Sequence, residues 1–264
     1  MTRVFFWRAF ANTATLLNAL SGIWAIIYII WGNKLFALAL IYTGIGWDGL
    51  DGYASRRSGN SGTLFGRVAD SVADSITFCV APAFLVSVDL YPTTTWQPYT
   101  IVSVFLAVLV AALGLYRLVR YTMDTHNFPY FLGASTPQNA IAIAFLVLLF
   151  DVPGFLMVEP VAFLVAVAIL APLMVLPVKY PKMRDPVARR RFLYPLMTAG
   201  AVAIALPNLF PSAATNSWSY LTAFAFALVG FLVLMAFYVA GPWLVKDERQ
   251  EVRAPGDPKS TRPT

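Results

Sequence analysis

Cysteine and charged residues are scarce in this sequence. Cys79 is the only cysteine among 264 residues, which excludes an internal disulfide and a metal site built from cysteine ligands. Charged residues make up only 12% of the chain, and hydrophobic residues make up 59%. A soluble domain of this length needs a more charged surface, because water must solvate its exterior. The composition therefore predicts a protein whose solvent is the lipid bilayer.

Apolar stretches recur along nearly the whole chain, and a membrane-spanning helix needs about 20 mostly apolar residues. We predict an all-α integral membrane protein, a bundle of about eight transmembrane helices formed by residues 1–245 as a single domain. Residues 246–264 are polar and contain proline, which predicts a disordered tail. Glycine, proline and charged residues separate the predicted helices, which cover roughly residues 11–32, 34–56, 66–91, 98–121, 136–151, 157–178, 192–210 and 218–244.

The positive charges are distributed unevenly between the two ends of this predicted bundle. An even number of spans puts both termini on one side, where 18 of the 19 Lys and Arg residues then lie, with only Lys34 opposite. Basic connections of multi-pass proteins face the cytoplasm, so we expect cytoplasmic termini and a location in the cell membrane. Topology and contact with anionic membrane lipids explain the net charge of +6, so nucleic acid is not an expected partner.

Four aspartates lie inside predicted membrane helices, where a carboxylate costs on the order of 3 kcal/mol and usually marks a functional site. Asp48 and Asp51 are near the cytoplasmic end of the second helix, and Asp70 and Asp74 near the cytoplasmic start of the third. Spacings of three and four residues put each pair on one helix face. A short reversal joins the two helices, so we expect the four carboxylates at one depth, in a site that faces the cytoplasm.

Four ionised carboxylates in a low-dielectric site need cations or protons close by. Two divalent metal ions would balance the charge, and oxygen ligands without nearby His or Cys favour Mg²⁺ or Mn²⁺, with Ca²⁺ as a further candidate. One alternative is ion pairing of these acids with Arg56, Arg57 and Arg67. A second is an ion-coupled transporter, although transporters usually place such acids near the bilayer midplane within inverted repeats, and neither feature is evident.

The connection between the two acidic helices is rich in glycine. Glycine permits close approach of the backbone to a ligand, and the N–H groups entering the third helix favour incoming phosphates. Glycine is also common in membrane helices for packing, so this pattern alone is weak evidence for a nucleotide site. The residues concerned are Gly52, Gly59, Gly62 and Gly66.

Together, the acids and glycines resemble the signature of the CDP-alcohol phosphatidyltransferase family, DxxDGxxAR followed after eight residues by GxxxDxxxD. Here Ser55 replaces the usual alanine, and nine residues separate Arg56 from Gly66. Near the start, residues 12–15 are similar to the family's PNxxT helix entry, with Ala11 in place of proline. Four further stretches resemble the phosphatidylserine synthase branch, whose archaeal members act on archaeol-type lipids; they are residues 12–28, 74–85, 130–140 and 173–184.

The resemblance implies transfer of a phosphatidyl or archaetidyl group from a CDP-activated lipid to a polar alcohol, with L-serine as the expected acceptor and CMP as the leaving product. Glycerol 3-phosphate, an inositol phosphate, ethanolamine or choline are the alternative acceptors. It also implies a homodimer. By the same resemblance, Asp48, Asp51, Asp70 and Asp74 hold the metal ions, Asp74 also acts as general base, and the CDP moiety is surrounded by Thr15, Gly52, Arg56 and Gly66.

Candidate residues for the acceptor or the lipid phosphate are Arg117 and Arg120, at the cytoplasmic end of the fourth helix. Their spacing allows both to face the bundle, where the guanidinium fork suits a carboxylate or phosphate. Snorkelling to lipid headgroups is the alternative explanation, and it applies equally to Lys179, Lys182 and Arg184. Further along, Thr136, Gln138 and Asn139 would either hydrogen-bond a polar acceptor or cap and pack the fifth helix.

Overall fold

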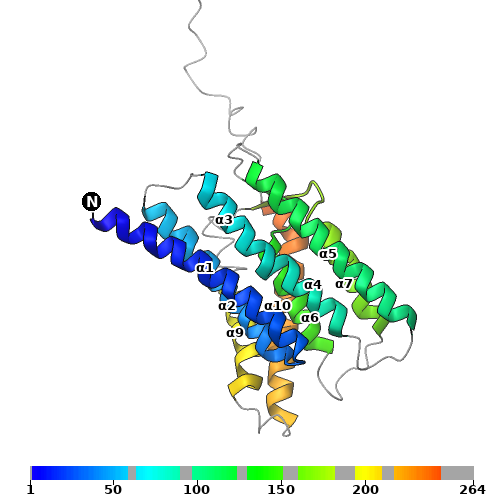
Figure 1. The fold of residues 1–264 in the computed structure, drawn as a ribbon. Coiled ribbons are helices and arrows are strands. Elements are labelled where there is room, and N and C mark those ends of the chain that lie inside the picture. Colours follow the sequence, from blue (N-terminus) through cyan, green and yellow to red (C-terminus); the bar gives the residue numbers. More distant parts are fainter. Residues whose placement is uncertain are drawn as a thin grey trace, which may run out of the picture.

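The computed structural model describes residues 2–58, 64–89, 97–123, 130–150, 160–181, 194–209 and 217–244, which are almost entirely helical. The prediction of an all-α chain is therefore confirmed, apart from two short strands (Figure 1). The helices are α1 (Thr2–Ile30), α2 (Lys34–Arg57), α3 (Leu64–Asp74), η1 (Ser75–Val80), α4 (Ala81–Asp89), α5 (Gln97–Met123), α6 (Thr136–Phe150), α7 (Pro160–Leu173), α9 (Tyr194–Leu209) and α10 (Ser217–Leu244). The predicted tail lies outside the described residues.

Four helical stretches are long and apolar enough to cross a membrane: Val4–Ile30, Phe65–Val88, Tyr99–Met123 and Thr222–Trp243. Each of the remaining predicted ranges also overlaps a helix, but α6, α7 and α9 offer only shorter apolar helices. At 1.5 Å per residue, the 15 residues of α6 extend about 22 Å, less than the about 30 Å of bilayer hydrocarbon. The membrane character of the chain is supported, and eight spans stay a prediction.

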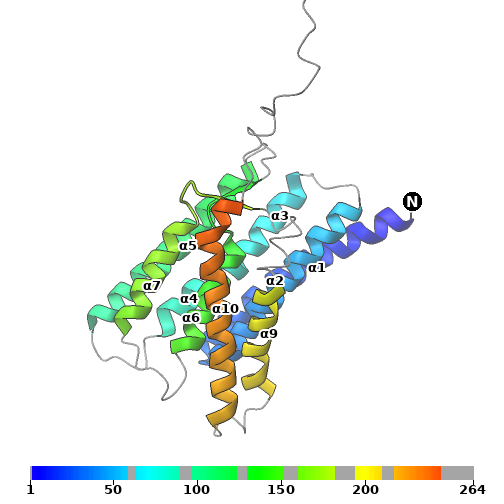
Figure 2. The same cartoon turned by 180° about the vertical axis from the view of Figure 1, so that it is seen from behind.

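The central helix of the bundle is α6. Its residues from Gln138 to Leu148 are buried on every side, as expected of a helix that is apolar all round. It packs against α10, α7, α4 and η1, and also touches α2, α5 and α9. Around it, α1 packs along α2 and α9 packs along α10, so that helices from both ends of the chain enclose one core (Figures 1 and 2).

The stretch α3–η1–α4 is one helix interrupted by a π-helical segment, which the sequence pattern did not predict. The segment begins directly after Asp74, and Thr77 inside it donates a 2.8 Å hydrogen bond from Oγ1 to the backbone oxygen of Asn18. A Cβ on Gly22 would lie 2.4 Å from Thr77 Oγ1, and one on Gly44 would lie 2.5 Å from Thr77 Cγ2. Only glycine at these two positions lets α1, α2 and η1 meet this closely around Thr77.

Two short strands, β1 (Tyr130–Leu132) and β2 (Lys179–Pro181), pair antiparallel with Phe131 opposite Tyr180. The sequence interpretation placed both segments in connections, because three residues carry too little alternation to indicate a strand. The Tyr180 ring stacks on Phe237 at a centroid distance of 5.7 Å, and its hydroxyl donates to the backbone oxygen of Tyr238 at 3.3 Å. Burial raises the pKa of Tyr180 further above neutral pH, in keeping with a protonated hydroxyl that donates this bond. The strand pair is thereby fixed to α10.

One end of the bundle collects the elements that carry the predicted site. The start of α1, the end of α2, the start of α3 and the end of α5 lie at this end in Figure 1. The end of α10 lies there as well in the reverse view of Figure 2.

Candidate active site

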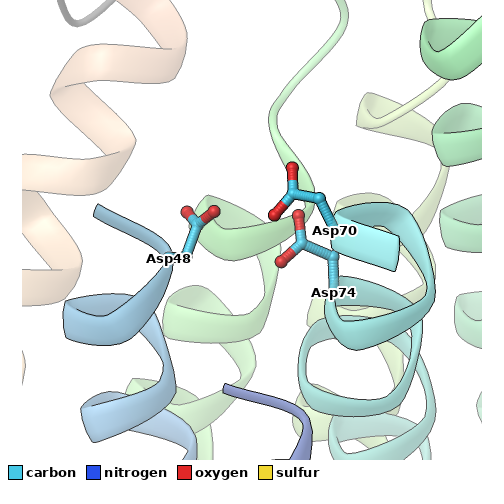
Figure 3. Close-up of side chains that lie close together, drawn as sticks. All are labelled: Asp48, Asp70 and Asp74. Carbon is cyan, nitrogen blue, oxygen red and sulfur yellow. The ribbon is translucent and has the colours of Figure 1, made fainter. Parts of the chain in front are cut away.

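Three of the four predicted acids converge between α2 and α3. Asp48 projects from α2 toward Asp70 and Asp74 of α3, and one carboxylate oxygen from each lies within 4.8 Å of the others (Figure 3). Asp74 is buried, and the other two are partly buried. The i, i+4 spacing on α3 therefore does place Asp70 and Asp74 on one face.

Asp51 joins the same cluster from the next turn of α2. It is only 6% exposed, lies within electrostatic reach of Asp70 and Asp48, and accepts a 2.8 Å hydrogen bond at Oδ2 from Thr15 Oγ1 of α1. Thr15, predicted near the nucleotide, is thus placed directly against an acid of the cluster. The four predicted carboxylates form one continuous group.

The donor set of this cluster suits hard divalent cations. It consists of carboxylate oxygens that are close enough to bind the same cation. Four like charges in a largely buried site also repel one another unless cations or protons lie between them. The Oδ1 atom of Asp70 is buried and has no hydrogen-bond partner within the described part of the chain, which leaves it available as a ligand. The residues present therefore fit the divalent ions that the sequence predicts.

Asn18 of α1 is a buried member of the site that the sequence analysis missed. Its Nδ2 donates a 2.9 Å hydrogen bond to Asp74 Oδ1, and its own backbone oxygen is held by Thr77. Asn18 is fully buried, one helical turn beyond Thr15 on the same face of α1. That spacing, a second polar residue in an apolar run, is the signal that would have identified it.

The basic residues near the cluster have different surroundings. Arg56 is exposed and lies within electrostatic reach of Asp48. Its guanidinium also lies close to Gly52, because a Cβ added at Gly52 would be 3.3 Å from Arg56 Nη1. Arg57 instead stacks over the rings of Trp7 and Tyr53, and the Arg67 guanidinium donates to the Thr122 backbone oxygen at 3.5 Å. The predicted alternative of ion pairing therefore has little support at Arg57 and Arg67.

Two of the four glycines of the predicted phosphate-binding connection are described. Gly52 lies in the last two turns of α2, and Gly66 is exposed in the first turn of α3. Gly59 and Gly62 lie outside the described residues.

The two arginines of α5 are separated by the fold. Arg117 is buried, 9% exposed, within electrostatic reach of Asp74, whereas Arg120 is on the exposed surface of the same helix. Of the other basic candidates, Lys179 is exposed on β2. Lys182 and Arg184 lie outside the described residues.

Comparison with known proteins agrees with this arrangement. The chain is 29% identical over 176 residues to the archaetidylserine synthase of Methanothermobacter thermautotrophicus. The aligned region covers 66% of this chain and 70% of the relative. It is 29% identical over 168 residues to the CDP-diacylglycerol–serine O-phosphatidyltransferase of Bacillus subtilis, covering 63% of this chain and 86% of the relative. The protein with the same name from Methanocaldococcus jannaschii is 30% identical over 172 residues, covering 65% of this chain and 73% of the relative.

The model of the CDP-alcohol phosphatidyltransferase family matches residues 8–176, well over half of the chain. The match spans both acidic pairs and the glycine-rich connection between them. The chain belongs to the CDP-alcohol phosphatidyltransferase family.

Proposed function

We propose that the protein transfers the phosphatidyl or archaetidyl group of a CDP-activated lipid to L-serine and releases CMP. The observation that carries this proposal is the convergence of Asp48, Asp70 and Asp74 at the positions of the family motif. The names of the three curated relatives described above, two serine phosphatidyltransferases and an archaetidylserine synthase, favour serine as the acceptor.

Asp48, Asp51, Asp70 and Asp74 would hold two divalent ions, Mg²⁺ or Mn²⁺, with Ca²⁺ as a further candidate. Such ions, when bound, neutralise a diphosphate and stabilise its leaving group. Thr15 fixes the carboxylate of Asp51, and Asn18 fixes that of Asp74, so that α1 orients one acid from each pair. Each hydrogen bond restricts the rotation of the carboxylate that accepts it.

Asp74 would remove the proton from the serine hydroxyl as it attacks phosphorus in line. The new bond joins the serine oxygen to the lipid phosphorus, the bond from phosphorus to the CMP oxygen breaks, and the proton passes to the Asp74 carboxylate. Its burial excludes water, which would otherwise compete with serine as the acceptor.

Thr15, Gly52, Arg56 and Gly66 would surround the CDP moiety. Gly52 lies near the end of α2 and Gly66 near the start of α3, on either side of the connection along the chain. Such small residues leave room for a nucleotide. The exposed guanidinium of Arg56 supplies positive charge next to Asp48. An exposed cation suits a diphosphate that enters from the aqueous side.

In this proposal, the four long apolar helices and the four further helices α2, α6, α7 and α9 together form an eight-span bundle in the cell membrane. The charge distribution favours cytoplasmic termini and a site that faces the cytoplasm, where CDP-lipid headgroups and serine are both accessible. Family resemblance favours a homodimer embedded among membrane lipids.

The acceptor is tested with purified protein, CDP-lipid and Mn²⁺, by measuring CMP release with serine, glycerol 3-phosphate, inositol phosphate, ethanolamine and choline in turn. We expect serine to give the highest kcat/KM. If another alcohol is clearly preferred, the acceptor assignment is wrong, although the family assignment stands.

A further inference from the structure

A set of buried polar atoms lies deeper in the bundle than the predicted ligands of the nucleotide. Within the described residues, Arg117 Nε, Thr136 Oγ1, Tyr238 Oη and both amide atoms of Asn139 are buried without a hydrogen-bond partner. Arg117 is 9% exposed, Tyr238 7% and Asn139 0%. Native proteins leave few such atoms unpaired, since each one forfeits its bond to water. Their concentration in one region indicates a ligand.

Two contacts between α5 and the antiparallel α3–η1 stretch fix the depth of Arg117. A Cβ on Gly114 would lie 2.6 Å from Cys79 Sγ, and farther along the hydroxyls of Ser71 and Thr122 hydrogen-bond. Both contacts give the same register, in which Arg117 is level with the first residues of η1. Arg117 is therefore next to Asp74 in depth, in agreement with the electrostatic interaction between the two side chains.

A similar register joins α6 to α10. A Cβ on Gly230 would lie 2.3 Å from Phe145 Cζ. The two helices run antiparallel, because β1, just before α6, pairs with β2, and Tyr180 of β2 bonds to Tyr238 near the end of α10. Counting back along α6 and forward along α10 puts Tyr238 level with the first turn of α6, which carries Thr136 and Asn139. Tyr238 in turn lies within electrostatic reach of Arg117. The unpaired atoms thus come from three helices at one depth.

We propose that Arg117, Asn139 and Tyr238 bind the carboxylate of the amino-acid acceptor, in a subsite beside Asp74. This inference rests on serine as the proposed acceptor. A guanidinium buried in a low-dielectric bundle requires an anion, and its planar fork matches a carboxylate bidentately. The Tyr238 hydroxyl and the Asn139 amide supply further donors. A serine held in this way presents its hydroxyl to Asp74.

The last helix is essential to this subsite. Tyr238 lies beyond residues 8–176, where the family model matches, so the common family segment does not contain it. The Tyr180 hydroxyl anchors the backbone of Tyr238, and the ring of Tyr180 packs against Phe237 and Tyr238. The strand pair and α10 would therefore position the specificity-determining hydroxyl.

The test compares Arg117→Lys and Tyr238→Phe with two control variants, Arg8→Lys and Tyr194→Phe, which change exposed residues of the same types. KM is measured separately for serine and for CDP-lipid, and the preference for L-serine over ethanolamine, which lacks the carboxylate, is determined for each variant. We expect both subsite variants to raise KM for serine roughly tenfold or more and to reduce that preference by a similar factor. KM for CDP-lipid should stay unchanged, which also reports an intact fold.

A rise in KM for CDP-lipid instead of serine would mean that the guanidinium binds the lipid phosphate, and the inference would be overturned. Unchanged values for both substrates in both variants would overturn it as well. Tyr238→Phe removes a single oxygen, so it decides the question even where Arg117→Lys fails to fold. A wild-type enzyme that does not use serine would contradict the proposed function itself, a result distinct from either of these.

Discussion

At the scale of single residues, a hydrogen bond from Asn18 holds one carboxylate of the acid cluster, that of Asp74. Asn18→Asp keeps the size of the side chain but removes the donor to Asp74 and adds a negative charge beside it. We expect kcat to fall by roughly a hundredfold or more, because like charges displace Asp74, the proposed general base, with a smaller change in KM for CDP-lipid. Thr13→Ala, an exposed change on the same helix, serves as the control. Near-normal turnover of Asn18→Asp would exclude a positioning role.

The acids themselves should be separable by function. Asp48→Asn, Asp51→Asn and Asp70→Asn should each lower activity by orders of magnitude, since loss of one ligand charge would disturb the whole proposed metal site. Asp89→Asn, at the far end of α4, should leave activity near wild type. Turnover is measured over a range of Mn²⁺ concentrations. Wild-type activity in any of the three variants would contradict the ligand assignment.

Asp74→Asn should lower the rate by roughly 10² to 10⁴-fold while CDP-lipid binding stays measurable, because the proposed general base is lost but the proposed nucleotide contacts remain. Binding of radiolabelled CDP-lipid at saturating Mn²⁺ separates this effect from weaker ion binding. Near-normal turnover would assign the base to another residue.

The acids could be predicted from the sequence because a carboxylate inside an apolar helix is unfavourable without a function. Asn18 is neutral, so its presence in an apolar helix is less unfavourable and indicated a function less clearly. The place of Tyr238 depends on how α10 packs against α6 and α5, which are far away in sequence, so hydropathy could not reveal it.

At the scale of elements, the contact of α2 with η1 sets the position of Asp48 relative to Asp74. Gly44→Ala would put a methyl group 2.5 Å from Thr77 Cγ2 and 3.0 Å from Asn18 Oδ1. Overpacking of this kind costs about 1–3 kcal/mol, so we expect a lower thermal unfolding temperature and reduced activity. Gly46→Ala, where a Cβ meets nothing within 4 Å, should be neutral or stabilising. Equal behaviour of the two variants would contradict the role of this close contact.

The positions of the helices could be predicted because long apolar runs are interrupted by glycine, proline and charge. The π-helical segment and the paired strands could not. Both arise from contacts between distant segments, Thr77 with Asn18 and β1 with β2, for which the local sequence carries no periodic signal.

At the scale of the whole molecule, the charge distribution predicts the orientation in the membrane. Single cysteines are introduced at residues 151 and 190 in a Cys79→Ser background, and intact cells are treated with an impermeant thiol reagent. Residue 190 should be protected and residue 151 labelled, because positive connections stay in the cytoplasm. Neither position lies within the described residues. The reverse pattern would place the active site on the outer face.

In the proposed mechanism, carboxylates from α2 and α3 form a metal-dependent site for transfer of a lipid phosphate to serine. The most direct measurement follows radiolabelled serine into lipid and CMP into solution in the same reaction, with Mn²⁺ and with excess EDTA. We expect equal amounts of labelled lipid and CMP with Mn²⁺, and neither product with EDTA. Full turnover in EDTA, or CMP release without labelled lipid, would contradict it.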